Sequence, residues 1–270
     1  MSRRETAPEG TLVRLEKALT AARHAGALLL RHRGRLQAVT HKGRVDLVSE
    51  ADRASEELLA GLLLGAFPLD AWLGEEGGSR GGPGPFRWIV DPLDGTTNYV
   101  HGLPIFAVSI ALQHEGHTVA GVVHTPVLGE TFHACRGAGA RRDRQPASVS
   151  TTDALVEAVL STGLPYERTA MAPRLLADWS WGIHNLQGLR RTGAAAVDLA
   201  WTACGRLDGY WERHIGPWDF AAGALLVEEA GGRASRPDGL PLAMEAGPVV
   251  ASNGRLHDRI LAGLAETPIP

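Results

Sequence analysis

The segment that most constrains this chain runs from Arg87 to Ala111, where a short apolar strand meets a cluster of acids. Trp88-Ile89-Val90 is apolar and short, as is typical of a buried strand. The next eight residues, 91–98, read DPLDGTTN and place two carboxylates three positions apart beside a proline and a glycine. The sequence therefore predicts a buried strand, then an acidic loop, then the start of a helix.

Such a loop is most often an Asp-Gly turn in which Asp94 or Thr96 caps the next helix. Other details favour a binding site. Pro92 fixes the backbone between the two acids. The carboxylates of Asp91 and Asp94 and the carbonyl of Leu93 can therefore converge on one point. Oxygen ligands from a rigid loop suit a hard divalent cation such as Mg²⁺, and the N–H groups that begin a helix attract phosphate.

The run WIVDPLDGTTNYVHGLP, residues 88–104, resembles the signature of the inositol monophosphatase family of Mg²⁺-dependent phosphomonoesterases. Three further segments are similar to motifs of that family: DLVSEAD at 46–52, GEE at 74–76 and WDFAAG at 218–223. The resemblance spans Lys42 to Gly223 through four motifs in order.

The resemblance implies a metal site and a catalytic pair. Two or three Mg²⁺ ions would be held by Glu75, Asp91, Asp94, Asp219 and the Leu93 carbonyl. Asp52 would pair with the Thr96 hydroxyl to orient the attacking water, with Glu75 also catalytic and Glu76 placing a water. The N–H groups of Gly95 and Thr96 would bind the phosphate.

The resemblance also implies a set of substrate contacts, made by Asp94, Gly193, Ala194, Ala195, Glu212 and Asp219. The family often carries Ser or Thr where Ala194 stands, so one possible hydroxyl contact is absent here. Without the resemblance, the spacing of these acids is equally compatible with structural roles. Asp52 and Asp219 could be first-turn helix carboxylates, and Glu75, Glu76 and Glu212 could be solvated acids.

The order of the predicted elements divides the chain into two halves. A helix is expected at 11–33, and consecutive strands at 107–115, 118–125 and 130–134 predict an antiparallel sheet. From Ala154 onward, strands near 156–161, 186–190, 207–213 and 249–252 alternate with helices near 171–181, 193–204, 218–230 and 255–264. Residues 79–85, rich in Gly and Pro, predict a flexible surface loop.

The expected fold class is therefore α/β of the α+β type. The resemblance implies a layered α-β-α-β-α sandwich with an antiparallel N-terminal sheet and a mixed C-terminal α/β half. Residues 11–270 are expected to form a single domain, divided into halves at 11–150 and 151–270. Residues 1–10 are expected to be a disordered tail.

Composition excludes several other classes of function. A formal net charge of −3 gives no basic surface for nucleic acid or for a membrane. No apolar stretch is long enough to cross a bilayer. The two cysteines, Cys135 and Cys204, form no CxxC pair, which fits a reducing cytoplasm. The eleven histidines include no HExxH, which argues against zinc.

The activity expected on these grounds is Mg²⁺-dependent hydrolysis of a small phosphate monoester, inositol-1-phosphate first among the candidates. Histidinol-phosphate phosphatase and fructose-1,6-bisphosphatase of the same fold remain open as alternatives, as does a regulatory binding protein on this scaffold. The absence of a nucleophilic Cys or Ser motif favours direct attack by water. The resemblance further implies a homodimer and inhibition by Li⁺.

Overall fold

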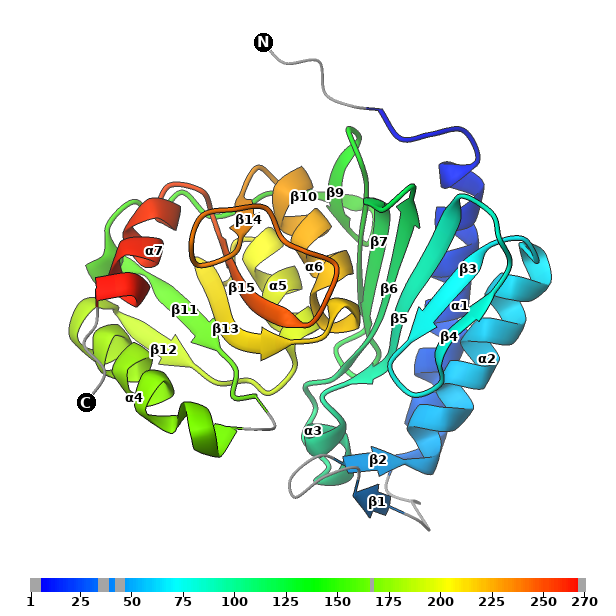
Figure 1. Ribbon diagram of the computed structural model, residues 1–270, viewed down its shortest axis with the longest axis horizontal. Coiled ribbons are helices and arrows are strands. Elements are labelled where there is room, and N and C mark those ends of the chain that lie inside the picture. The colour runs from blue at the N-terminus through cyan, green and yellow to red at the C-terminus, as the bar shows by residue number, and fades with distance from the viewer. Residues whose placement is uncertain (1–5, 34–38, 42–46, 166–167, 267–270) are drawn as a thin grey trace.

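The computed structural model describes residues 6–33, 39–41, 47–165 and 168–266. These residues form five layers, α-β-α-β-α (Figure 1). An eight-stranded sheet and a five-stranded sheet stand face to face with helices α5 and α6 between them. The predicted layered α/β sandwich is confirmed.

The larger sheet uses strands from residues 71–147, in the order β10-β9-β8-β7-β6-β5-β3-β4. Every neighbouring pair in it is antiparallel except β3 and β5, which run parallel, so this sheet is mixed. Its strands are β3 Ala71–Gly74, β4 Gly78–Gly81, β5 Phe86–Asp94, β6 Ala107–His114, β7 His117–Thr125, β8 Glu130–Cys135, β9 Gly139–Arg142 and β10 Gln145–Ala147.

The smaller sheet uses strands from residues 159–252, in the order β12-β11-β13-β15-β14. Its pairs are parallel on one side of β13 and antiparallel on the other. The strands are β11 Val159–Thr162, β12 Gly188–Arg190, β13 Gly209–Ile215, β14 Arg233–Ser235 and β15 Gly247–Ser252. A separate two-stranded ribbon pairs β1 Val39–His41 with β2 Leu47–Ser49.

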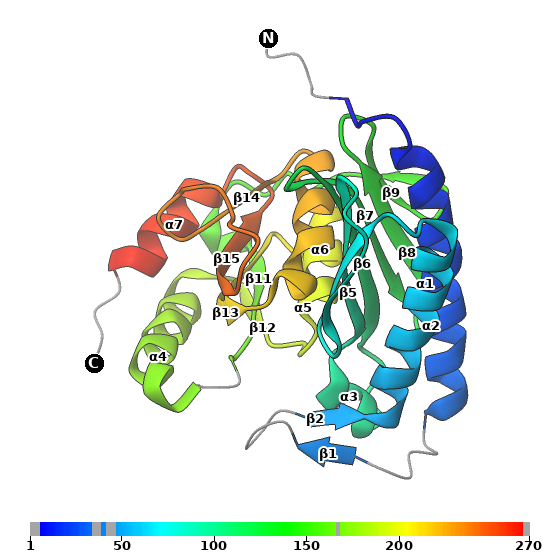
Figure 2. The same cartoon turned by 45° about the vertical axis from the view of Figure 1, so that its right-hand side comes forward.

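Three helical layers cover the two sheets (Figures 1 and 2). On the outer face of the larger sheet lie α1 Thr11–His32 and α2 Glu50–Ala66; between the sheets lie α5 Ala195–Ala203 and α6 Pro217–Glu229; outside the smaller sheet lie α4 Arg168–Asn185 and α7 His257–Glu266. The short helix α3 Thr96–Val100 follows β5, and a 3₁₀ turn, η1 Leu155–Glu157, precedes β11.

The composition of the helices explains their layers. Helices α1 and α2 bury one face, for example through Ala22, Leu29 and Leu59, as amphipathic helices do. Helix α6 lies between two sheets and is apolar nearly all round, with Phe220 and Leu225 each 1% exposed. The buried middle layer therefore brings the N-termini of α5 and α6 close to the end of β5 (Figure 1).

Several local predictions need correction. Residues 79–81, expected in a flexible loop, belong to β4, which pairs with β3 because the turn between the two strands is fixed by a buried carboxylate. The strand predicted from Val156 begins instead at Val159, after the 3₁₀ turn. The short strands β9, β10 and β14 were not predicted. Part of the expected disordered tail, residues 1–5, and the start of the DLVSEAD motif lie outside the described residues.

Candidate active site

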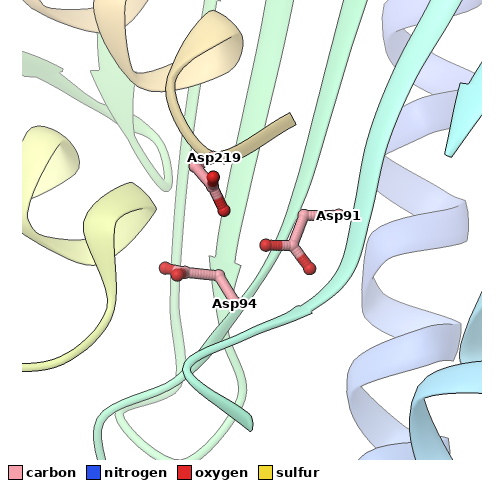
Figure 3. A group of neighbouring side chains, drawn as sticks. All are labelled: Asp91, Asp94 and Asp219. Carbon is pink, nitrogen blue, oxygen red and sulfur yellow. The ribbon is translucent and has the colours of Figure 1, made fainter. Parts of the chain in front are cut away.

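Three of the predicted ligands meet in one place. Asp91, Asp94 and Asp219 each offer a carboxylate oxygen, and these oxygens lie within 4.8 Å of one another. Figure 3 shows the three side chains converging from two separate parts of the chain, the end of β5 and the start of α6. Within the described part of the chain, this is the group of side chains suited to hold a metal ion.

A bulge in β5 turns its two acids toward this point. Asp91 pairs with Ser109 and Asp94 with Ala107, so the register shifts between the two acids. A bulge bends the strand and re-aims its side chains, and it tolerates a proline because a ladder bond is already lost there. Two further bonds fix the segment. The Leu93 N–H donates to Asp91 Oδ1 at 2.9 Å, and the Ser55 hydroxyl donates to the Pro92 carbonyl at 2.9 Å.

Asp94 also caps a helix, but not the one that follows it in sequence. Its two oxygens accept the N–H groups of Ala195 and Ala196 at 3.0 and 2.9 Å, at the start of α5. Helix α3 begins after Gly95, with no side-chain cap. A carboxylate at a helix N-terminus satisfies free N–H groups and is favoured by the helix dipole. The acidic loop therefore holds the first sheet to a helix more than a hundred residues away in sequence.

Asp219 likewise combines capping with membership of the cluster. It is the third residue of α6, and its Oδ2 accepts the Gly216 N–H at 2.7 Å. Pro217 occupies the first turn, where its missing N–H costs nothing. Asp219 therefore has both roles: it caps α6, as its spacing allowed, and it belongs to the acidic cluster.

The electrostatics of the cluster show uncompensated negative charge. Burial, followed by the charges of Glu75, Asp94 and Asp219, raises the pKa of Asp91 well above its ordinary value. Burial raises the pKa of Asp94 to about 8, and burial with the neighbouring Asp94 and Glu212 raises the pKa of Asp219. Such shifts are expected where carboxylates crowd together without a cation.

Thr96 and Asp52 form the predicted pair. The Thr96 hydroxyl lies 2.9 Å from Asp52 Oδ1 and 3.1 Å from the Leu93 carbonyl, and both side chains are buried. Asp52 stands in the first turn of α2, so this bond crosses from α2 to the loop after β5. The observed contact places a hydroxyl with a fixed orientation beside the acidic cluster.

Glu75 lies at the rim of the cluster. It lines the same cavity as the three aspartates, and its charge contributes to the raised pKa of Asp91. It is not one of the acids whose oxygens meet within 4.8 Å. Glu76 follows it in the turn after β3 and is not among the residues that line the cavity.

A cavity of about 450 Å³ opens beside the cluster. Its lining includes all the remaining predicted contacts, namely Leu93, Gly95, Thr96, Gly193, Ala194, Ala195 and Glu212. Glu212 Oε2 accepts a bond from the Tyr210 hydroxyl at 2.5 Å, and burial raises the Glu212 pKa to about 7. This volume lies within the range typical of small-molecule sites.

The sequence reading missed two buried acids near the site. Glu56 is 2% exposed and accepts the N–H groups of Glu76 and Gly77, each at 2.9 Å, so it fixes the turn that carries Glu75. Asp198, on α5, is 1% exposed and lines the cavity. A signal for Glu56 was present: with Asp52 and Ser55 it puts polar residues on the apolar face of α2, at helical spacing.

The donor set fits a hard divalent cation. All the converging ligands are oxygens from carboxylates, the chemistry that Mg²⁺ prefers, and a cation would relieve the repulsion that raises their pKa values. No zinc-type arrangement of His or Cys occurs among the described residues. Among them, too, no helix combines the length and apolarity needed to cross a membrane.

Comparison of the sequence with known proteins points to the same family as the motifs. Residues 13–268 match the model of the inositol monophosphatase family. An inositol-1-monophosphatase of a Synechocystis species is 43% identical, covering 94% of this chain and 89% of its own. A Pseudomonas aeruginosa protein named Nus factor SuhB is 42% identical, covering 92% and 94%.

The structural comparison agrees with the sequence comparison. The crystal structure of extragenic suppressor protein suhB from Bartonella henselae superposes with a TM-score of 0.90 at 38% identity, covering 94% of this chain and 98% of that one. With its family motifs spread along nearly the whole chain and its acids gathered at one cavity, this chain belongs to the inositol monophosphatase family.

Proposed function

We propose that this protein hydrolyses a small phosphate monoester in a Mg²⁺-dependent reaction, and that inositol-1-phosphate is its substrate. The observation that carries the proposal is the convergence of Asp91, Asp94 and Asp219 at a cavity of sugar-phosphate size. Glu75 and the Leu93 carbonyl complete the proposed ligand set, which would hold two or three ions. Mg²⁺ bound there would lower the pKa of a water and offset phosphate charge.

The chain's own groups have defined parts in this proposal. Asp52 accepts the hydrogen of the Thr96 hydroxyl, which leaves an oxygen lone pair of Thr96 to receive a proton from the attacking water. The N–H groups of Gly95 and Thr96, at the cavity wall, bind phosphate oxygens without adding charge. As water attacks phosphorus, its proton passes to Thr96 and the Thr96 hydrogen passes to Asp52. The ester P–O bond breaks, and the sugar oxygen leaves with a proton taken from a second water.

The sugar would occupy the rest of the cavity. Asp94, Glu212 and Asp219 accept hydrogen bonds from its hydroxyls, while Gly193, Ala194 and Ala195 form a wall without bulky side chains. Ala194 supplies no hydroxyl, so recognition depends on acidic acceptors and backbone groups. An acceptor-rich wall of this kind favours polyhydroxylated substrates.

The test is phosphate release from inositol-1-phosphate, histidinol phosphate and fructose-1,6-bisphosphate, with Mg²⁺ and with EDTA. We expect Mg²⁺-dependent release with the highest kcat/KM for inositol-1-phosphate. Asp91→Asn should lower kcat by at least about 100-fold, the scale of losing one electrostatic group in an active site. Asp238→Asn, an exposed acid paired with Arg236, is the matched control. A preference for another substrate would overturn the assignment to inositol phosphate.

A binding function without catalysis is a second candidate, because a relative of 42% identity is named a Nus factor. Gene replacement separates the two. If cells that carry Asp91→Asn grow as the wild type while cells without the gene do not, the binding function is favoured. If both strains fail alike, the hydrolase function is favoured.

The proposal includes three further properties: inhibition by Li⁺, a dimeric state and a cellular location. Inhibition of phosphate release by Li⁺ is expected. A homodimer is expected by light scattering. The cytoplasm is the proposed location, consistent with the two free cysteines, Cys135 and Cys204.

A further inference from the structure

Asp198 is a buried acid that the proposed mechanism does not use. It lies in the first turn of α5 and is 1% exposed, and its sequence neighbours Val197 and Leu199 are fully buried apolar residues. It nevertheless lines the cavity beside the acidic cluster. A buried carboxyl group carries a large desolvation cost unless it has partners, so its position requires a reason.

Asp198 is less fully partnered than the other buried acids. Another buried acid, Asp178, is ion-paired with Arg174 and Arg213, and Asp208 accepts bonds from Ser150 Oγ and the Val159 N–H at 2.5 and 2.7 Å. By contrast, Asp198 Oδ1 has no hydrogen-bond partner among the described residues. Part of the hydrogen-bonding capacity of Asp198 is therefore not met by the described residues.

Two hydroxyl groups lie beside Asp198. Hydrogen bonding from the Thr192 and Ser161 hydroxyls lowers the pKa of Asp198, but burial has the larger effect and raises that pKa to about 8. Among the described residues, Ser161 Oγ makes no other hydrogen bond. Asp198 is also one of the residues that line the cavity. A group entering the cavity could therefore complete its hydrogen bonding.

The charges near Asp198 indicate what kind of group this is. Glu212, the proposed hydroxyl acceptor, is close enough to raise the Asp198 pKa, and Arg191 lowers the pKa of both acids. Because the Arg191 guanidinium already offsets the charge of Asp198 and Glu212, a second cation is not needed beside these two acids. A neutral donor, the hydroxyl group of a polyol, fits better.

We propose that Asp198 is a further specificity-determining residue, whose carboxyl group accepts a hydrogen bond from a ring hydroxyl of a polyol phosphate beside the contact made by Glu212. This inference rests on the proposed function. It predicts that the protein distinguishes ring-hydroxylated esters from esters that share only the phosphate group.

The experiment compares inositol-1-phosphate with p-nitrophenyl phosphate, whose leaving group has no ring hydroxyls beyond the ester oxygen. For Asp198→Asn, we expect the fall in kcat/KM on inositol-1-phosphate to exceed that on p-nitrophenyl phosphate by at least tenfold, mainly through KM. Binding of free myo-inositol to the metal-free protein, measured by calorimetry, should weaken in parallel. Asp198→Ser is the second variant, in case the first folds poorly.

Asp178→Asn is the matched control, because Asp178 is equally buried but lies outside the cavity. It should lower Tm and leave the ratio of the two kcat/KM values within twofold of the wild type. An unchanged ratio in Asp198→Asn would overturn the inference. So would a larger loss on histidinol phosphate, since that would indicate recognition of an ammonium group. If the wild type releases phosphate from no ester with Mg²⁺, the proposed function itself has failed.

Discussion

Thr96 joins three parts of the site through a single hydroxyl group. That hydroxyl contacts Asp52 of α2 and the carbonyl of Leu93, while its backbone begins α3. Both partners are acceptors, so the hydroxyl hydrogen must point toward one of them and an oxygen lone pair is left to face the cavity. The position calls for a donor that is also an acceptor, which valine cannot be.

Thr96→Val is therefore expected to lower kcat by about 10²- to 10⁴-fold, the range associated with loss of acid–base assistance, with a smaller change in KM. The measurement is steady-state phosphate release at saturating Mg²⁺. Thr125→Val is the control, because Thr125 is also buried but donates to the Glu130 carbonyl, away from the cavity. Equal losses in both variants would mean that Thr96 has only a structural role.

At the scale of elements, the β3–β4 turn depends on an acid from α2. Each Glu56 oxygen accepts one backbone N–H from residues 76 and 77. A Cβ added to Gly74 or Gly77 would come within 2.6 Å of the Glu56 carboxylate, so the turn is built closely around that group. This contact fixes the backbone on which Glu75 faces the cavity.

Glu56→Ala should lower the free energy of unfolding by about 2–4 kcal/mol, since two backbone N–H groups of the turn lose their acceptor and Arg80 loses one ion-pair partner. Chemical denaturation of the metal-free protein measures this. Its neighbour Glu57 provides the control. The Glu57 side chain is 74% exposed and pairs with Arg80, so Glu57→Gln should change stability by no more than about 0.5 kcal/mol. A similar effect of the two variants would contradict the role given to Glu56.

The elements also show what the sequence could and could not provide. Periodicity located most helices and strands, and the motifs identified acids that the fold brings to one cavity. The partner of Asp94 could not be read from sequence, because local capping rules point to the next helix and the actual partner is α5. Asp198 was missed for a related reason: in sequence it is an ordinary first-turn acid, and only tertiary packing reveals that it lines the cavity.

At the scale of the whole molecule, stability should depend on pH in a direction set by the buried acids. The folded pKa values of Asp94 and Asp198 are about 8 and that of Glu212 about 7, all above the ordinary values of these groups. The folded state therefore holds protons that the unfolded state has released, and this stabilisation is lost as pH rises from about 4 to 8. His257 acts in the opposite direction: burial lowers its folded pKa to about 4, so its contribution to stability increases as pH rises.

Burial also lowers the pKa of His124 and His133, in the same sense as that of His257. Because the pKa values of Asp94 and Asp198 are shifted further than those of the three histidines, the metal-free protein should be more stable at pH 5 than at pH 8. We expect Tm to fall by at least about 4 °C between these values, a shift that about 1–2 kcal/mol produces in a chain of this size. Differential scanning calorimetry in EDTA measures it. Mg²⁺ added at pH 8 should recover much of the loss. A Tm that rises steadily from pH 5 to 8 in EDTA would contradict this account.

The bond from Asp94 to the start of α5 has a consequence for protein engineering. Because one carboxylate from the first sheet is seated on the Ala195 and Ala196 amides, the two sheets cannot be exchanged between relatives as independent modules. A chimera joined near residue 150 would assemble only if the donor's backbone at 194–196 meets the recipient's aspartate. Gly95 adds a second condition, because a Cβ added there would lie 3.1 Å from that of Ala194. The relative that supplies the second half must therefore leave room at both positions.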